Sequence, residues 1–247
     1  MSSGPRPTPA RDTIDFATAF RFAFEDPDWI KKILIGGAFM LLSMFLVGAV
    51  FVAGYGVRLI RRTAAGDPRP LPEWEDLGGM FGDGLRALAI YFVYVLPVVV
   101  VPMAFAVVVA MAGAGLSGAS SARGASEAVN ALAAVGFMGL YALTAVLMLV
   151  LSLYVPAALA RFVMLDRVSA AFEVRENLAF IRRNLGNYAM TLLLYLVASF
   201  AAQLGIILCC VGFLPASFWA VCVLCWSLGE VVRRDATLSP VRTGTPA

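Results

Sequence analysis

The stretch PDWIKKILIGGAFMLLSMFLVGAVFVAGYGVRLIRR, from Pro27 to Arg62, decides how the fold is interpreted. Its apolar middle, residues 33–57, is long enough to cross a bilayer, because a spanning helix needs about 20 apolar residues. Basic residues stand at both of its ends, namely Lys31, Lys32, Arg58, Arg61 and Arg62. Loops rich in Lys and Arg tend to stay in the cytoplasm, so an ordinary span should carry most of its positive charge at one end.

The composition around this stretch predicts a polytopic membrane protein. Of the 247 residues, 61% are hydrophobic and 14% are charged, whereas soluble domains have roughly 45–50% apolar and about 25% charged residues. Residues 1–12 and 236–247 are polar or rich in Pro and Thr, and we expect them to be disordered tails. The residues between them, 13–235, are then a single membrane domain.

Four further apolar segments are long enough to cross, and residues 33–57 could be a fifth. They are 87–112, 131–160, 188–208 and 213–231. Pro97, Pro102 and Pro156 predict kinks inside them. We expect amphipathic interfacial helices at 13–29, where Phe16, Phe20 and Phe24 share one face, after Arg62, around Trp74, and at 161–187, where Phe172, Val174, Leu178 and Ile181 form the apolar face. Trp29 would anchor at the level of the lipid headgroups.

The charge count separates two topologies for residues 33–57. If they form a full span, making five, the 19 basic residues divide as 13 on one side and 6 on the other. If they form a re-entrant hairpin that enters and leaves on one face, the division becomes 18 to 1, with only Arg123 outside. The sequence therefore favours four full spans plus an N-terminal re-entrant helical hairpin, with both termini cytoplasmic. A single tilted span stays open as the alternative.

Glycines give the hairpin local support. They occur near its entry in IGG, near its tip in VGA and near its exit in AGYG. Each leg would have about 12 residues and rise roughly 18 Å, too short for a hydrocarbon core of about 30 Å. A re-entrant turn is stable only where other protein buries its backbone.

Three motifs together resemble a known family. They are FRFAFEDPDWIKKILIGG (20–37), GYGVRLIRR (54–62) and LPEWEDLGGMFGDGL (71–85). They are similar to the prokaryotic integral-membrane family called domain of unknown function 4013, and the likeness is strongest over about residues 13–90. The matching positions are Asp26, Pro27, Trp29, Lys31, Gly54, Tyr55, Leu71, Pro72, Glu73, Trp74 and Asp76. The resemblance implies a bacterial or archaeal membrane protein and supplies no activity.

No catalytic, metal or cofactor signature stands out. The chain has no histidine, the commonest acid–base residue and metal ligand. Cys222-x-x-Cys225 lies inside an apolar helix, where the favoured interpretation is packing, and Cys209 and Cys210 would allow a disulfide to another chain. The span interiors carry no charged residue, which argues against a proton-coupled transporter. We expect a non-enzymatic protein without cofactors.

The candidate contact residues are basic or aromatic and lie near segment ends. They are Arg58, Arg61, Arg62, Arg182, Arg183, Arg233, Arg234, Trp29 and Trp74. The arginines could hold an anionic lipid headgroup or report topology alone, and the acidic segment at 73–76 could bind a cation or simply begin a helix. The leading function is a structural or accessory subunit of a membrane complex in a prokaryotic inner membrane, with lipids and copies of itself or other subunits as partners and no nucleic acid. The alternative is a permease-like component.

Overall fold

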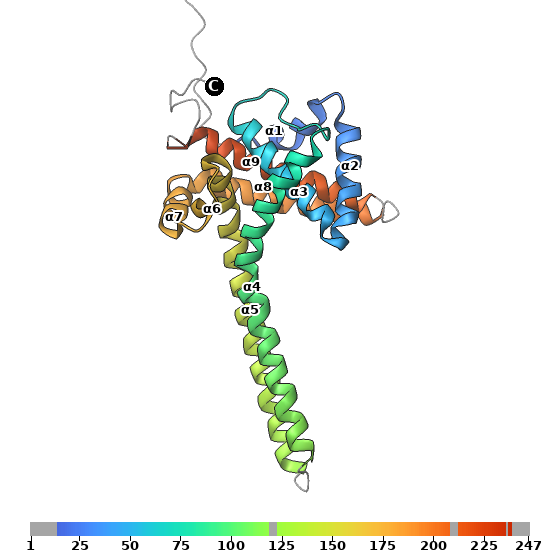
Figure 1. The fold of residues 1–247 in the computed structure, drawn as a ribbon, viewed down its shortest axis with the longest axis vertical. Coiled ribbons are helices and arrows are strands. Elements are labelled where there is room, and N and C mark those ends of the chain that lie inside the picture. The colour runs from blue at the N-terminus through green and yellow to red at the C-terminus, as the bar shows by residue number, and fades with distance from the viewer. Residues whose placement is uncertain (1–13, 119–122, 208–211, 236, 239–247) are drawn as a thin grey trace, which may run out of the picture. The chain divides into compact units, whose positions relative to one another are not determined.

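The computed structural model describes residues 14–118, 123–207, 212–235 and 237–238, and only the backbone of 112–118, 123–130, 132 and 207. These residues form helices and no strand, which confirms the all-α class (Figure 1). Among these described residues, four helices are long and apolar enough to cross a membrane. The expected tails lie almost wholly outside the described residues.

The helices follow one another in a simple order. They are α1 (Phe16–Arg21), η1 (Phe22–Glu25), α2 (Trp29–Leu42), η2 (Ser43–Phe45), α3 (Val47–Ala64), α4 (Leu77–Gly118), α5 (Arg123–Leu165), α6 (Val168–Ala171), α7 (Val174–Arg183), α8 (Leu185–Gln203), η3 (Leu204–Ile207) and α9 (Phe213–Arg234). The chain divides into two compact units. One holds the described residues up to Leu88 and from Ala157 onward, and the other holds Ala89–Pro156.

Residues 33–57 form two helices rather than one. The chain leaves α2 through the short η2 turn and reverses at Leu46, which has a positive φ of 63°. Gly48 then lies so close to the Phe39 carbonyl that a side chain would not fit there. The Phe39 and Phe51 rings meet across the two legs with centroids 4.9 Å apart. The structure thus has a helical hairpin at this place, not a continuous 25-residue helix.

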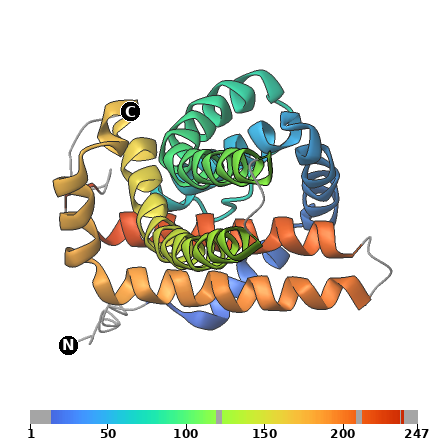
Figure 2. The same ribbon diagram turned by 90° about the horizontal axis from the view of Figure 1, so that it is seen from below.

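Helix α9 is the core of the first unit, and α2, α3 and α8 pack against it (Figure 2). Gly36 of α2 lies against Phe218, and Gly56 of α3 lies against the Cys225 sulfur. Small residues allow such close helix approach. Cys222 and Cys225 are buried in this packing and form no disulfide, whereas Cys209 and Cys210 lie outside the described residues.

Helix α4 begins earlier than the sequence suggested. The interfacial helix expected around Trp74, leading into the next span, begins after Trp74, at Leu77, and is continuous with α4 through Pro97 and Pro102. Gly54 of α3 touches the Met80 carbonyl, and Gly84 of α4 touches the Val50 carbonyl. This contact of two backbones fixes the first turns of α4 on the hairpin, so the helix has no reason to break there.

The second unit is an antiparallel pair formed by the remaining parts of α4 and α5 (Figure 1). The Phe105 and Phe137 rings meet edge to face at 5.4 Å, and the Tyr94 and Tyr154 hydroxyls lie 3.5 Å apart. Most other side chains between Ala89 and Met111 and between Ala133 and Pro156 are exposed aliphatic groups. The outer surface of the pair is therefore apolar, as is typical of a membrane-spanning helix.

The two expected surface helices are shorter than the sequence suggested. Residues 13–29 break into α1 and η1 before Asp26, and Phe20 packs on Trp219 of α9 with ring centroids 5.4 Å apart. Residues 161–187 divide among the end of α5, α6, α7 and the start of α8. In α7 the buried residues are Asn177 and Phe180, while Val174 and Leu178 of the expected apolar face are exposed.

Candidate functional site

Two of the three motif segments, 20–37 and 71–85, meet at the side chain of Lys32. Its ammonium lies 2.8 Å from Asp26 Oδ2 and 2.5 Å from Glu73 Oε1. It also donates a hydrogen bond to the Leu71 carbonyl at 3.3 Å. Lys32 and Asp26 are each 4% exposed at the side chain, whereas Glu73 is half exposed. We call these three residues the Lys32 cluster.

Local sequence explains how the Lys32 cluster is held. Asp26 precedes a proline and has the extended backbone, φ −78° and ψ 127°, that this position favours. Its carboxylate accepts a hydrogen bond from the Asp28 backbone N–H at 2.9 Å, and α2 starts one residue later. The Trp74 indole N–H donates to the Lys32 carbonyl at 3.1 Å, and its ring stacks on Tyr55 at 4.6 Å. The acidic segment is thereby tied to the base of the hairpin.

The Lys32 cluster keeps its charges because they compensate one another. Burial by itself lowers the pKa of Lys32, since it removes water from the ammonium. The hydrogen bonds and charges of Asp26 and Glu73 outweigh burial, so the pKa of Lys32 lies above its usual value. The ammonium is therefore a permanent cation that joins α2 to the segment before α4, and it is unsuited to act as a general base.

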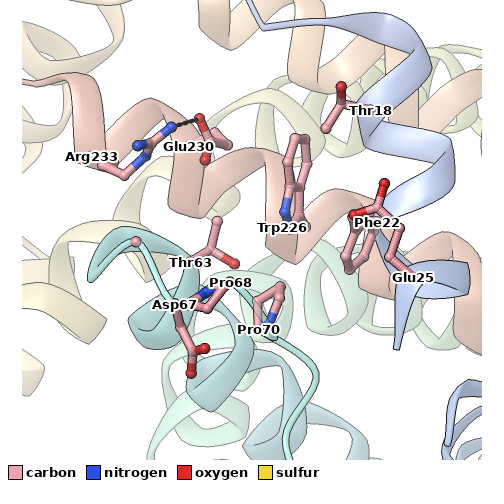
Figure 3. A pocket seen from close by; sticks show the side chains of 11 residues that line it. Thr18, Phe22, Glu25, Thr63, Asp67, Pro68, Pro70, Trp226, Glu230 and Arg233 are labelled. Atoms are coloured by element: carbon pink, nitrogen blue, oxygen red, sulfur yellow. Dashed lines mark hydrogen bonds and ion pairs between the residues drawn. The ribbon is translucent and has the colours of Figure 1, made fainter. Parts of the chain in front are cut away.

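Residues of the connector after α3 line two small pockets, and Asp67 lines both. The first, about 240 Å³, is lined by the Lys32 cluster with Arg62, Arg69 and other residues. The second, about 230 Å³, lies between η1, the end of α3 and the end of α9 (Figure 3). We call the second the Thr63 pocket, lined by Thr18, Phe22, Glu25, Thr63, Gly66, Asp67, Pro68, Pro70, Trp226, Glu230 and Arg233.

Most of the predicted arginines have acceptors within the chain. Arg58 lies 2.6 Å from Asp76, Arg61 lies 2.9 Å from Asp166, and both lie near Asp83. Arg62 donates to the Leu71 carbonyl at 3.2 Å. Glu230 lies 2.7 Å from Arg233 and 3.2 Å from Arg234. Asp235 lies 3.6 Å from Arg183.

The remaining predicted contact residues differ in their surroundings. Arg182 is exposed and has no ion pair in the part of the chain that the structure describes. Trp29 makes an edge-to-face contact with Phe24 at 4.8 Å, and Trp74 lies in the aromatic group at the hairpin base. The ion-paired arginines among the predicted residues thus belong to separate networks that share no carboxylate across α3, α7 and α9. Their contact with lipid stays a prediction.

A second buried charge was missing from the sequence-based candidates. Arg161, 7% exposed, donates to Asn177 Oδ1 at 3.0 Å and lies 2.8 Å from Glu173. Asn177 donates to the Ala171 carbonyl at 2.6 Å. Arg161 thereby holds α6 and α7 against the end of α5. In the sequence, Arg161 is recognisable only as a charge at the end of an apolar run, and the charge count interpreted it as a marker of membrane topology.

Among the residues that the structure describes, no group of three or more His, Cys, Asp or Glu side chains is arranged to hold a metal ion. The acidic segment at 73–76 is divided between two partners, since Glu73 faces Lys32 and Asp76 faces Arg58. The backbone N–H of Gly79 and the Arg58 guanidinium lower the pKa of Asp76. The segment thus anchors the hairpin base.

Comparison with known proteins matches one family model. The model described as "Protein of unknown function (DUF4013)" matches residues 38–211. This range includes Gly54, Tyr55 and the 71–76 segment but begins after Asp26–Lys31, so the strong likeness expected for 13–90 extends less far toward the N-terminus and much further along the spans. No curated protein and no solved structure matches the chain significantly. The match covers most of the chain, which therefore belongs to the DUF4013 family, whose function is unknown.

Proposed function

We propose that the chain is a non-enzymatic integral protein of a prokaryotic inner membrane, acting as a structural or accessory subunit with both termini cytoplasmic. Its hairpin enters the bilayer from the cytoplasmic face and returns to it. Basic residues at that face contact anionic headgroups, among them the exposed Lys31 and Arg182, which have no ion pair in the described part of the chain. Trp29 would lie at the same level.

The observation that carries this proposal is the polarity of the hairpin. Its tip is strongly apolar and open, with Met44 81%, Phe45 77% and Leu46 71% exposed. Its two ends carry the charges, with Lys31 and Lys32 at the start of α2 and basic residues in the last turns of α3. Exposing such a tip to water costs about 25 cal/mol for each Å² of apolar surface. A tip in lipid with a base in water avoids this cost.

The leg lengths agree with partial entry. The apolar parts, Ile33–Leu42 and Val47–Val57, would rise about 15 and 17 Å, roughly half of the hydrocarbon core. The packing of both legs on α9 supplies the protein cover that a re-entrant backbone needs. A permease function lacks such support, because no charged residue lies between Ala89 and Met111 or between Ala133 and Pro156.

Cysteine accessibility tests the proposal. All four native cysteines are replaced, and single cysteines are placed at Phe45 in the tip, at Ala65 near the base and at Ser120, which lies outside the described residues. In intact cells a membrane-impermeant maleimide should label Ser120→Cys alone. Ala65→Cys should react only after the inner membrane is permeabilised. A fluorophore on Phe45→Cys should be quenched by brominated lipid in reconstituted vesicles.

Two outcomes would overturn the topology. Labelling of Ala65→Cys from outside would place the hairpin base on the wrong face. Labelling of Phe45→Cys from outside, without quenching by brominated lipid, would place the tip in the external water. The Ser120→Cys variant is the matched control, because it shows in each preparation that the reagent reaches the outer face.

A further inference from the structure

The Thr63 pocket combines features that no ion pair or packing role explains. It lies in the first unit, where η1, the end of α3 with its connector, and the last turns of α9 approach one another (Figure 3). Its volume of about 230 Å³ is below the range of about 300–1,000 Å³ typical of drug-sized ligands. The size suits a group of a few heavy atoms.

Two carboxylates in the lining have no cation partner. Glu25 and Asp67 form no ion pair with any residue that the structure describes, and Asp67 accepts only a backbone N–H, from Arg69 at 2.9 Å. Glu230 also lines the pocket, but its charge is compensated by Arg233, 2.7 Å away (Figure 3). The lining is therefore left with two uncompensated negative charges, which favour a cationic occupant.

A buried hydroxyl in the lining points to the same conclusion independently. Thr63 is 3% exposed, and its Oγ1 has no hydrogen-bond partner among the described residues. The Thr63 methyl side faces Gly229 of α9, and Figure 3 shows its oxygen turned toward Pro68 and Pro70, which also line the pocket. Buried hydroxyl groups almost always have a partner, so this one indicates a missing group with hydrogen-bonding capacity.

Aromatic rings form one wall of the pocket. Phe22 and Trp226 stack with centroids 5.1 Å apart and are 5% and 7% exposed. Such a wall keeps water from one side of a bound cation, and the attraction to nearby carboxylates is stronger where the effective dielectric constant is lower. Aromatic rings also attract organic cations more readily than strongly hydrated metal ions.

We propose that the Thr63 pocket binds an organic ammonium group, with Glu25 and Asp67 as its counter-charges and the Thr63 hydroxyl as its hydrogen-bond partner. The group would be either the headgroup of an aminophospholipid or a free small amine. This inference goes beyond the proposed function and does not depend on whether the hairpin tip enters the bilayer.

The test measures stabilisation of the whole protein by two amine sources. In detergent, the thermal midpoint is followed against ethanolamine, with ethylene glycol as the neutral isostere and NaCl at matched ionic strength. In nanodiscs, phosphatidylethanolamine mixed with phosphatidylglycerol is compared with phosphatidylglycerol alone. A rise with ethanolamine identifies a free amine as a sufficient ligand, and a rise with phosphatidylethanolamine alone identifies the lipid headgroup.

Variants connect the stabilisation to the pocket. The double variant Glu25→Gln/Asp67→Asn keeps the shape of both side chains and should abolish the midpoint shift. Thr63→Val should weaken binding roughly tenfold, the factor that corresponds to one lost polar contact, while the ligand-free protein becomes no less stable. Glu75→Gln/Glu176→Gln removes the same number of exposed carboxylates outside the pocket and should leave the shift intact.

Either of two results would overturn the inference. One is the absence of stabilisation by both amine sources in the native sequence. The other is an equal shift in Glu25→Gln/Asp67→Asn and in Glu75→Gln/Glu176→Gln, which would reduce the effect to general surface charge.

Discussion

Helix α9 and the two helices of the α4–α5 pair are all apolar in composition, but they differ in how much of each is buried. All three helices are long and apolar enough to cross a membrane. Of the 18 residues in the most apolar stretch of each helix, 67% are buried in α9, against 6% in α4 and 0% in α5. Hydropathy therefore reports that a helix avoids water, but it does not report whether protein or lipid replaces the water.

The difference follows from what surrounds each helix. Around α9, glycines of α2 and α3 allow neighbouring backbones to approach closely, as at Gly36 and Gly56. Along the α4–α5 pair, large aliphatic side chains such as Val108 and Met138 stay exposed at 64% and 74%. The two units also differ in charge. The unit that contains α9 buries Lys32 and Arg161, whereas no charged residue lies between Ala89 and Met111 or between Ala133 and Pro156.

The largest effect should come from breaking a buried charge in the unit that contains α9. Replacing Lys32 by Met would leave Asp26 buried without its cation. Removing one partner of a buried pair typically costs about 3–5 kcal/mol, so we expect Lys32→Met to lose most of the stability of the unit. Chemical unfolding in detergent, followed by tryptophan fluorescence, measures the loss.

Lys31→Met is the matched control, because Lys31 is the exposed neighbour of Lys32. It should change the free energy of unfolding by less than about 0.5 kcal/mol. The double variant Lys32→Met/Asp26→Asn should recover much of the loss, since neither buried charge then remains. Equal effects of Lys31→Met and Lys32→Met would contradict the structural role of the Lys32 cluster.

The contrast between Lys31 and Lys32 also shows what the sequence could and could not predict. The apolar runs predict the four long helices, and the glycines with the charge count predict a break within 33–57. The partners of Lys32, in contrast, lie 6 residues before it and 41 residues after it. Only the packing of α2 against the segment before α4 separates a buried lysine from its exposed neighbour.

Helix α7 shows a similar limit. The apolar pattern predicted that Val174 and Leu178 face lipid or protein, and the structure leaves both exposed while Asn177 and Phe180 are buried. Arg161 at the end of α5 needs acceptors once it is buried, and Asn177 supplies one at 3.0 Å. The burial of Asn177 thus follows from a long-range requirement for hydrogen bonds, which a single sequence does not reveal. The Thr63 pocket escaped prediction for the same reason, since its lining comes from three distant segments.

The second prediction compares the loss of stability when a valine is shortened in α9 and in α4. Val223 of α9 is fully buried, whereas Val108 of α4 is 64% exposed. Val223→Ala should destabilise the protein by roughly 2 kcal/mol through lost contacts and the cavity left behind. Val108→Ala should cost less than about 0.5 kcal/mol. Thermal midpoints of both variants in one detergent test this, and equal losses would show that α4 is also covered by protein.

The smallest expected effect concerns Asp235, the residue that directly follows α9. Asp235 accepts hydrogen bonds from Asn184 and Thr237 and lies 3.6 Å from Arg183. Burial by itself raises the pKa of Asp235, but these hydrogen bonds and the arginine outweigh it, so the pKa lies below its usual value. Because the folded state binds the proton less readily than the unfolded state, Asp235 stabilises the fold above its unfolded pKa, near 4.

That contribution should disappear as the pH falls through the lowered pKa of folded Asp235. We therefore expect the thermal midpoint in detergent to fall on acidification below about pH 4. Asp235→Asn should start from a lower midpoint at neutral pH and lose less of it in acid. Glu176→Gln, which removes an exposed carboxylate from α7, should keep the full acid response. If Asp235→Asn and the native chain lost the same amount, the carboxylate would not link α9 to the start of α8, and the acid sensitivity would have to arise at another group.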